Sequence, residues 1–164
     1  MSAGPSGITE EATIIDMALD ADGKFVVLRP GTNGWFCAVD DPASPVNDPA
    51  CYDQVWLDWV YAFVAGEEPN VTMPGFAYMY QGEGSASNTD PAAMEPAPGE
   101  ARMQSGPHVM IILPASVDLS GVNTVHDTAD PWVMWAGTPY AHIMMPVGGT
   151  SELPDMPTLP IEAP

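Results

Sequence analysis

Basic side chains are nearly absent from this sequence. Lys24, Arg29 and Arg102 are the only ones among 164 residues, against 22 aspartates and glutamates, and the net charge is −19 at pH 7. Most carboxylates must therefore be solvated, hydrogen-bonded to backbone or bound to a metal ion. So negative a chain repels phosphate backbones and anionic lipids, which argues against nucleic acid and membrane surfaces as partners. The acidity has two interpretations, solubility in a saline habitat or a role in handling cations.

Long apolar runs and cysteines are also scarce. No run of about 18 apolar residues exists, so we expect no membrane insertion. The only cysteines, Cys37 and Cys51, do not have the spacing of a zinc motif and cannot complete a zinc site by themselves. We predict a disulfide between them, which would close a loop of about 15 residues and add about 3 kcal/mol of stability. The alternative is a pair of free buried thiols.

The predicted disulfide indicates an oxidising compartment. Residues 1–7, however, have neither the basic nor the apolar region of a signal peptide. We therefore expect either a cytosolic chain or a periplasmic or secreted one from which the signal peptide has been removed.

Known catalytic signatures are missing as well. The sequence has no G-x-S-x-G elbow, no H-E-x-x-H motif and no phosphate-binding loop. A cysteine nucleophile would need a reduced thiol, which the disulfide opposes. An enzyme of unknown reaction that uses His108 or His142 as its acid or base remains an alternative.

The composition predicts one α+β domain of low helix content. The length suits a single domain, while 19 prolines and 15 glycines interrupt the backbone often. We expect a flexible N-terminus over 1–11, a globular domain over 12–147 and an extended Pro-rich tail over 148–164. The tail is a candidate contact with another subunit, through Leu153, Met156, Leu159 and Ile161.

The apolar pattern predicts a mainly antiparallel sheet of five to seven strands. Strands at 12–17, 25–28 and 35–39 should form a meander, whose second turn contains the Asn33-Gly34 pair favoured by type I′ hairpins. Four more strands are expected at 76–80, 109–113, 132–135 and 143–147. Residues 81–107 read as a long irregular loop, in which oxygen ligands for calcium are conceivable but match no EF-hand pattern.

One principal helix is predicted at about 49–65. Asp48 has the character of its N-cap, Pro49 suits the first helical position, and Gly66 can end the helix. The helix is apolar around most of its circumference, so we expect it to lie buried against the sheet. Trp56 and Trp59 are then core residues rather than a surface that stacks on sugars.

Two His-x-Met steps provide the sharpest chemical hypothesis. His108 precedes Met110 by two residues, and His142 precedes Met144 in the same way. Side chains two apart in a strand point to the same face, so two aligned strands would bring imidazoles and thioethers together. This ligand set favours a transition metal, copper first, because thioether sulfur selects Cu(I). The alternative is structural, since methionine is a common core residue.

The chain resembles a family of uncharacterised exported bacterial proteins that carry signal peptides. The stretches that carry the resemblance are ATIIDM (12–17), LRPGTNGWFC (28–37), NDPACYD (47–53), GEGSASNTDPAA (82–93), GPHVMII (106–112) and WAGTPYAHIMMPV (135–147). The resemblance implies an exported mature domain with Cys37 and Cys51 at the two cysteine positions of the family. It implies no activity, and it does not extend to the tail. The function we expect is that of a small acidic exported binding protein.

Overall fold

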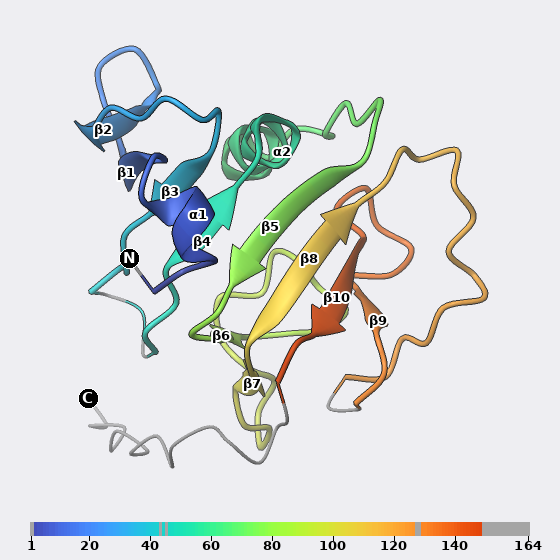
Figure 1. Cartoon of the computed structure of the whole chain (residues 1–164). Coiled ribbons are helices and arrows are strands. Elements are labelled where there is room, and N and C mark those ends of the chain that lie inside the picture. Colours follow the sequence, from blue (N-terminus) through green and yellow to red (C-terminus); the bar gives the residue numbers. More distant parts are fainter. Residues whose placement is uncertain (1, 43, 45, 127–128, 149–164) are drawn as a thin grey trace.

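The computed structural model describes residues 2–42, 44, 46–126 and 129–148, which form mostly sheet (Figure 1). An eight-stranded sheet has the order β2-β1-β3-β4-β5-β8-β10-β9, and β6 and β7 form a separate two-stranded sheet. The eight strands are β1 (Thr13–Leu19), β2 (Phe25–Arg29), β3 (Phe36–Ala38), β4 (Ala50–Tyr52), β5 (Gly75–Met79), β8 (His108–Ile112), β9 (Trp132–Met134) and β10 (His142–Pro146). The other elements are β6 (Glu83–Ser85), β7 (Met103–Ser105), α1 (Ser6–Thr9) and α2 (Gln54–Ala65).

This architecture suits the predicted α+β class, but the large sheet exceeds the expected five to seven strands. All of its pairings are antiparallel except that of β1 with β3. No helix within the described ranges is long and apolar enough to cross a membrane. The predicted tail contact lies at residues 149–164, outside the described residues.

The predicted meander is wrong at its third strand. β1 and β2 do form the expected antiparallel hairpin, but β3 then pairs parallel to β1 on its other side. A type I′ turn needs positive φ at both central residues, and of Asn33 and Gly34 only Gly34 has it (φ 75°). Asn33 instead accepts a hydrogen bond from the Trp35 backbone N–H and donates one to the Ile8 carbonyl. After this turn the chain therefore lies on the other side of β1, and β3 does not pair with β2.

The predicted helix start is also wrong. Residues 50–52 are strand β4, which lies between β3 and β5, and α2 begins only at Gln54. Asp53 is the N-cap: one carboxylate oxygen accepts from the Trp56 N–H and the other from the Phe76 N–H of β5, both at 2.8 Å. Pairing on both sides of β4 outweighs the local signal at Asp48. The predicted end is confirmed, because Gly66 adopts the left-handed conformation (φ 68°).

One face of α2 forms the main core with one face of the sheet. Trp56, Leu57, Trp59 and Val60 are buried, so the prediction that the two tryptophans are core residues is confirmed. A buried tryptophan removes about 150–250 Å² from water. At about 25 cal/mol per Å² this corresponds to about 4–6 kcal/mol for each ring, before conformational entropy is subtracted. This packing holds the helix on the sheet.

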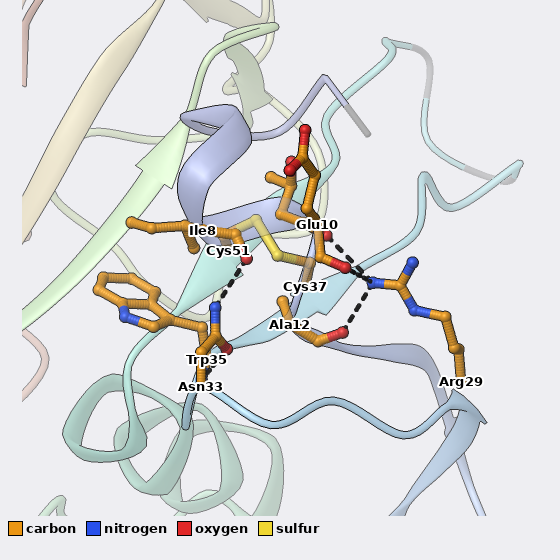
Figure 2. The surroundings of a disulfide bond; sticks show 9 residues. Ile8, Glu10, Ala12, Arg29, Asn33, Trp35, Cys37 and Cys51 are labelled. Carbon is orange, nitrogen blue, oxygen red and sulfur yellow. Dashed lines mark hydrogen bonds between the residues drawn. A yellow bond between two sulfur atoms is a disulfide. The ribbon is translucent and has the colours of Figure 1, made fainter.

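The N-terminal segment and the disulfide form a second, smaller core (Figure 2). The predicted Cys37–Cys51 disulfide is confirmed, and it joins two residues directly opposite each other on β3 and β4. Residues 1–11 were expected to lie loosely on the surface, but Ala3 is fully buried beside the bridge. Arg29 helps to hold this segment, because its guanidinium donates to the carbonyl oxygens of Thr9, Glu10 and Ala12.

The stretch at 81–107 is less irregular than predicted. Its two ends form the β6–β7 ladder, with Glu83 opposite Ser105 and Ser85 opposite Met103. Farther along the loop, the Asn88 side chain donates to the Thr124 carbonyl, and the Asn88 carbonyl accepts from the Trp135 N–H. The loop is thereby attached to the segment that contains β9.

We predict that Asp53→Ala lowers the free energy of unfolding by about 2 kcal/mol. The variant loses a helix cap, worth about 1 kcal/mol, and the hydrogen bond that ties the cap to β5. Urea unfolding followed by circular dichroism measures the difference. Asp58→Ala is the matched control: among the described residues, Gln54 alone donates to this exposed aspartate of the same helix, so its loss should cost less than 0.5 kcal/mol. Equal effects of the two substitutions would contradict the role given to Asp53.

Candidate functional site

The two His-x-Met steps lie on adjacent antiparallel strands. Met110 and Met144 are directly opposite each other, and His108 pairs with Pro146. All four predicted metal residues, His108, His142, Met110 and Met144, are buried. Because the strands run in opposite directions, the histidines are at opposite ends of the group, about 13 Å apart along the strands. The structure therefore brings the two methionines together but not the two imidazoles.

Each imidazole is held by a carbonyl two residues before it. Nδ1 of His108 lies 2.7 Å from the Gly106 oxygen, and Nδ1 of His142 lies 3.0 Å from the Tyr140 oxygen. A carbonyl can only accept, so in a neutral ring Nδ1 carries the proton and Nε2 carries the lone pair. Nε2 of His108 is buried, and none of the described residues is its hydrogen-bond partner. A buried polar atom of this kind calls for an explanation.

Burial keeps both imidazoles neutral. It lowers the pKa of each histidine from the usual 6.5 to about 4, and the smaller influence of His108 on His142 acts in the same direction. Both rings thus present an unprotonated Nε2 at neutral pH, as a metal ligand or a hydrogen-bond acceptor would require. Within the described part of the chain, no group of three or more histidine, cysteine, aspartate or glutamate side chains could hold a metal ion. A metal bound by the described residues would need other ligands as well, such as methionine sulfur.

A cavity of about 340 Å³ is lined by α2, the sheet and the β6 strand. Its size falls at the lower end of the range for small-molecule sites, about 300–1,000 Å³. Five aromatic side chains line it, namely Tyr52, Trp56, Trp59, Phe63 and Trp135, with four methionines, Met17, Met79, Met110 and Met134. The polar side chains of the lining are Asp41, Asp48, Glu83, Ser85 and His142. Two of the predicted metal residues, His142 and Met110, therefore face this cavity.

Trp135 gives the aromatic wall its shape. The rings of Trp59, Phe63 and Trp135 are nearly parallel, with interplanar angles of 2–7°, and His142 meets Trp135 edge-on. Trp135 has φ 54° and is the one described non-glycine residue with positive φ. This conformation costs about 1–2 kcal/mol. Hydrogen bonds from its backbone N–H to Asn88 and from its indole N–H to Ser87 hold it in place.

Carboxyl groups form another part of the wall. Glu83 is half-buried, yet its Oε1 is fully buried without a hydrogen-bond partner among the described residues. Burial and the nearby Asp48 raise the pKa of Glu83 to about 7. Burial also raises the pKa of Asp48, although Ser44 donates to its carboxylate at 2.7 Å. The pKa of Tyr52 is raised by burial and by both carboxylates.

None of the three basic side chains reaches these carboxyl groups. Lys24 lies over the Tyr61 ring, 4.8 Å from its centroid. Arg29 holds the N-terminal segment, and Arg102 pairs with Glu95 at 3.1 Å. The lining of the cavity accordingly contains acids and neutral groups but no lysine or arginine.

Sequence reasoning missed Glu83 and Trp135 as cavity residues. Glu83 appeared only as one acid of a long loop, and Trp135 as the last residue of a strand. One local signal was present, the Gly82-Glu83-Gly84 triplet. Gly82 has φ 82°, and a side chain there would collide with the Ser105 carbonyl, while a Cβ at Gly84 would lie 3.1 Å from Val46. The two glycines therefore let the backbone at Glu83 approach its neighbours closely.

No family model, no curated protein and no solved structure matches this chain.

We predict that Glu83→Gln stabilises the protein increasingly as pH rises. The folded protein favours the protonated carboxyl, since the pKa is raised from the usual 4.5 to about 7. Wild-type stability from this group is therefore lost as pH rises from 4.5 through 7 and is not lost in the variant. The difference in unfolding free energy between variant and wild type should grow by up to about 3 kcal/mol between pH 4 and pH 8.

Urea unfolding at both pH values tests this prediction. Both proteins contain the same histidines, so histidine titration cancels in the comparison. Glu95→Gln is the matched control, because the Glu95 side chain is 84% exposed and its surface ion pair contributes little. A difference between Glu83→Gln and wild type that does not change with pH would contradict the assignment.

Proposed function

We propose that this protein is an exported binding protein whose ligand is a small organic molecule held in the cavity between α2 and the sheet. The observation that carries the proposal is the cavity itself, with aromatic and thioether walls and a few polar groups facing inward. This combination is typical of ligand sites. The strained Trp135 adds support, because residues held in strained conformations cluster at functional sites. Export is supported by the disulfide and by the family resemblance.

Binding suits these residues better than catalysis does. Both described cysteines are in the disulfide, so neither offers a thiolate nucleophile. A pKa of about 4 makes His108 and His142 weak bases at neutral pH. An enzyme that uses either histidine as its acid or base remains the alternative function.

A cavity-filling variant tests the proposal. Ala38 lines the cavity and is 3% exposed, so Ala38→Leu places three more carbon atoms in the cavity space. We expect at least one of benzyltrimethylammonium, indole and benzoate to bind the wild type in ligand-detected NMR titrations. The leucine variant should bind that compound at least tenfold more weakly.

Ala97→Leu adds the same atoms at an exposed position and should bind as the wild type does. Thermal unfolding of both variants shows whether each is folded. The proposal is overturned if none of the three compounds binds, or if a folded Ala38→Leu protein binds as well as the wild type.

Copper(I) binding near His108 is the second candidate function. The observation that favours it is the buried Nε2 of His108 without a described partner, on the same sheet face as the Met110–Met144 pair. One imidazole nitrogen and two thioether sulfurs form a soft ligand set, which suits Cu(I) better than zinc or magnesium. The Gly106 carbonyl would orient the ring as outer-shell partners of metal-bound histidines do. His142 lies too far along the sheet to bind the same ion as His108, Met110 and Met144.

Anaerobic Cu(I) titration of untagged protein tests this candidate. We expect one Cu(I) per chain and at least tenfold weaker binding by Met110→Leu/Met144→Leu, which removes both sulfurs while keeping the side-chain volume. Met145→Leu is the matched control, because Met145 lies on the same strand as Met144 but is 36% exposed. Absence of binding, or equal binding by the double variant and the wild type, would exclude the site.

A further inference from the structure

Building on the proposed function, we infer that the ligand of the cavity is a small organic cation, a quaternary ammonium or alkylated amine with a compact apolar body. Two features of the wall lead to this class: aromatic rings gathered around the space, and carboxyl groups that face it without a basic partner. Each feature alone is compatible with neutral ligands. Together they favour a positive charge.

The aromatic wall suits an alkylated cation. Trp59, Phe63 and Trp135 have ring centroids 5.3–6.2 Å apart, and Trp56 lies 5.3 Å from Trp59. The negative face of an aromatic ring attracts a cation within about 6 Å, and tryptophan does so most strongly. Aromatic side chains recognise quaternary ammonium groups, because methyl groups contact the rings while the charge is stabilised.

The carboxyl groups supply the opposite charge. Oε1 of Glu83 is buried without a described partner, and Asp48 lies close enough to influence its protonation. Leaving a carboxyl in this state costs stability that a structural role does not explain, whereas a bound cation would balance the charge of the ionised carboxylate. A cation bound in the cavity would therefore favour the ionised form of Glu83.

The charges around the cavity disfavour anionic and neutral ligands. No lysine or arginine lines the cavity, and burial keeps His142 neutral, so an anion would find no positive group there. The net charge of −19 repels anions from the whole molecule and raises the local concentration of cations. A neutral ligand without a hydrogen-bond donor would leave Oε1 of Glu83 unpaired.

A matched pair of ligands tests the charge directly. Choline and 3,3-dimethylbutan-1-ol have the same shape, but carbon replaces the charged nitrogen in the alcohol. Ligand-detected NMR titrations of the wild type at pH 8 should show choline binding at least tenfold more tightly than the alcohol. In Glu83→Gln this preference should fall by at least threefold, while Glu95→Gln should keep it.

The pH dependence provides a second readout. Choline affinity should rise about tenfold from pH 5 to pH 8 in the wild type as Glu83 ionises, and it should rise much less in Glu83→Gln. The other titratable groups near Glu83 are Asp40, Asp41, Asp48, Tyr52 and His142. Of the neighbours whose pKa is shifted, His142 and Tyr52 do not ionise in this pH range.

The outcomes separate this inference from the proposed function. If the alcohol binds as tightly as choline and Ala38→Leu weakens both, the cavity is a ligand site but the preference for cations is refuted. If choline binds Ala38→Leu as well as it binds the wild type, its site lies outside the cavity and this inference is overturned, whatever the earlier panel shows. If a compound of the earlier panel binds in the cavity but choline does not prefer it over the alcohol, only the inference is overturned.

Discussion

The fold depends on the packing of α2 against one face of the eight-stranded sheet. Trp56 and Trp59 are the largest of the buried helix side chains, and Asp53 fixes where the helix starts by accepting hydrogen bonds from its first turn and from β5. The cavity lies beside these rings, so its walls include several of the side chains that form the core, among them Trp56, Trp59 and Met110.

The scarcity of basic residues determines how the interior handles charge. All three bases contact groups outside the cavity, and buried carboxyls near β4 and β6 therefore have no cationic side chain. Such groups can be neutralised by protonation or by a positively charged ligand. The two buried histidines respond to the same low-polarity surroundings by remaining neutral. At mildly acidic pH the Glu83 carboxyl and the two buried imidazoles are therefore mainly uncharged, even though the molecule carries a large negative charge.

Local patterns in the sequence predicted most of the elements but not their neighbours. Apolar runs located β1, β2, β5, β8, β9 and β10, and Gly66 marked the helix end, because these features depend on residues close in the chain. The position of β3 depended on whether Asn33 adopts positive φ. The formation of β4 depended on pairing partners more than 10 residues away along the chain. Secondary-structure propensity depends on local residues, so it predicts neither the position of β3 nor the formation of β4.

For the candidate site, too, local patterns predicted some features and missed those that depend on tertiary contacts. The buried His-x-Met residues were predictable as a group, because alternation assigns them to one face of their strands. The antiparallel register then separated the imidazoles, and no local pattern indicates that register. Trp135 lies in the cavity wall because it contacts α2 and the loop at Ser87 and Asn88. Glu83 lies there beside Asp48, which is distant along the chain. The sequence thus indicated the histidines and methionines as candidate site residues, but it did not show which side chains contact one another.

The grouping of tryptophans around the cavity has an optical consequence. Of the five tryptophans in the chain, Trp56, Trp59 and Trp135 line the cavity, while Trp35 packs in the second core beside the disulfide. Indole emission responds to the polarity and charge of its immediate surroundings. A molecule entering the cavity would therefore alter the intrinsic fluorescence of most of the tryptophans in the protein, with no label attached. Intrinsic fluorescence of the unmodified protein would therefore report whether the cavity is occupied.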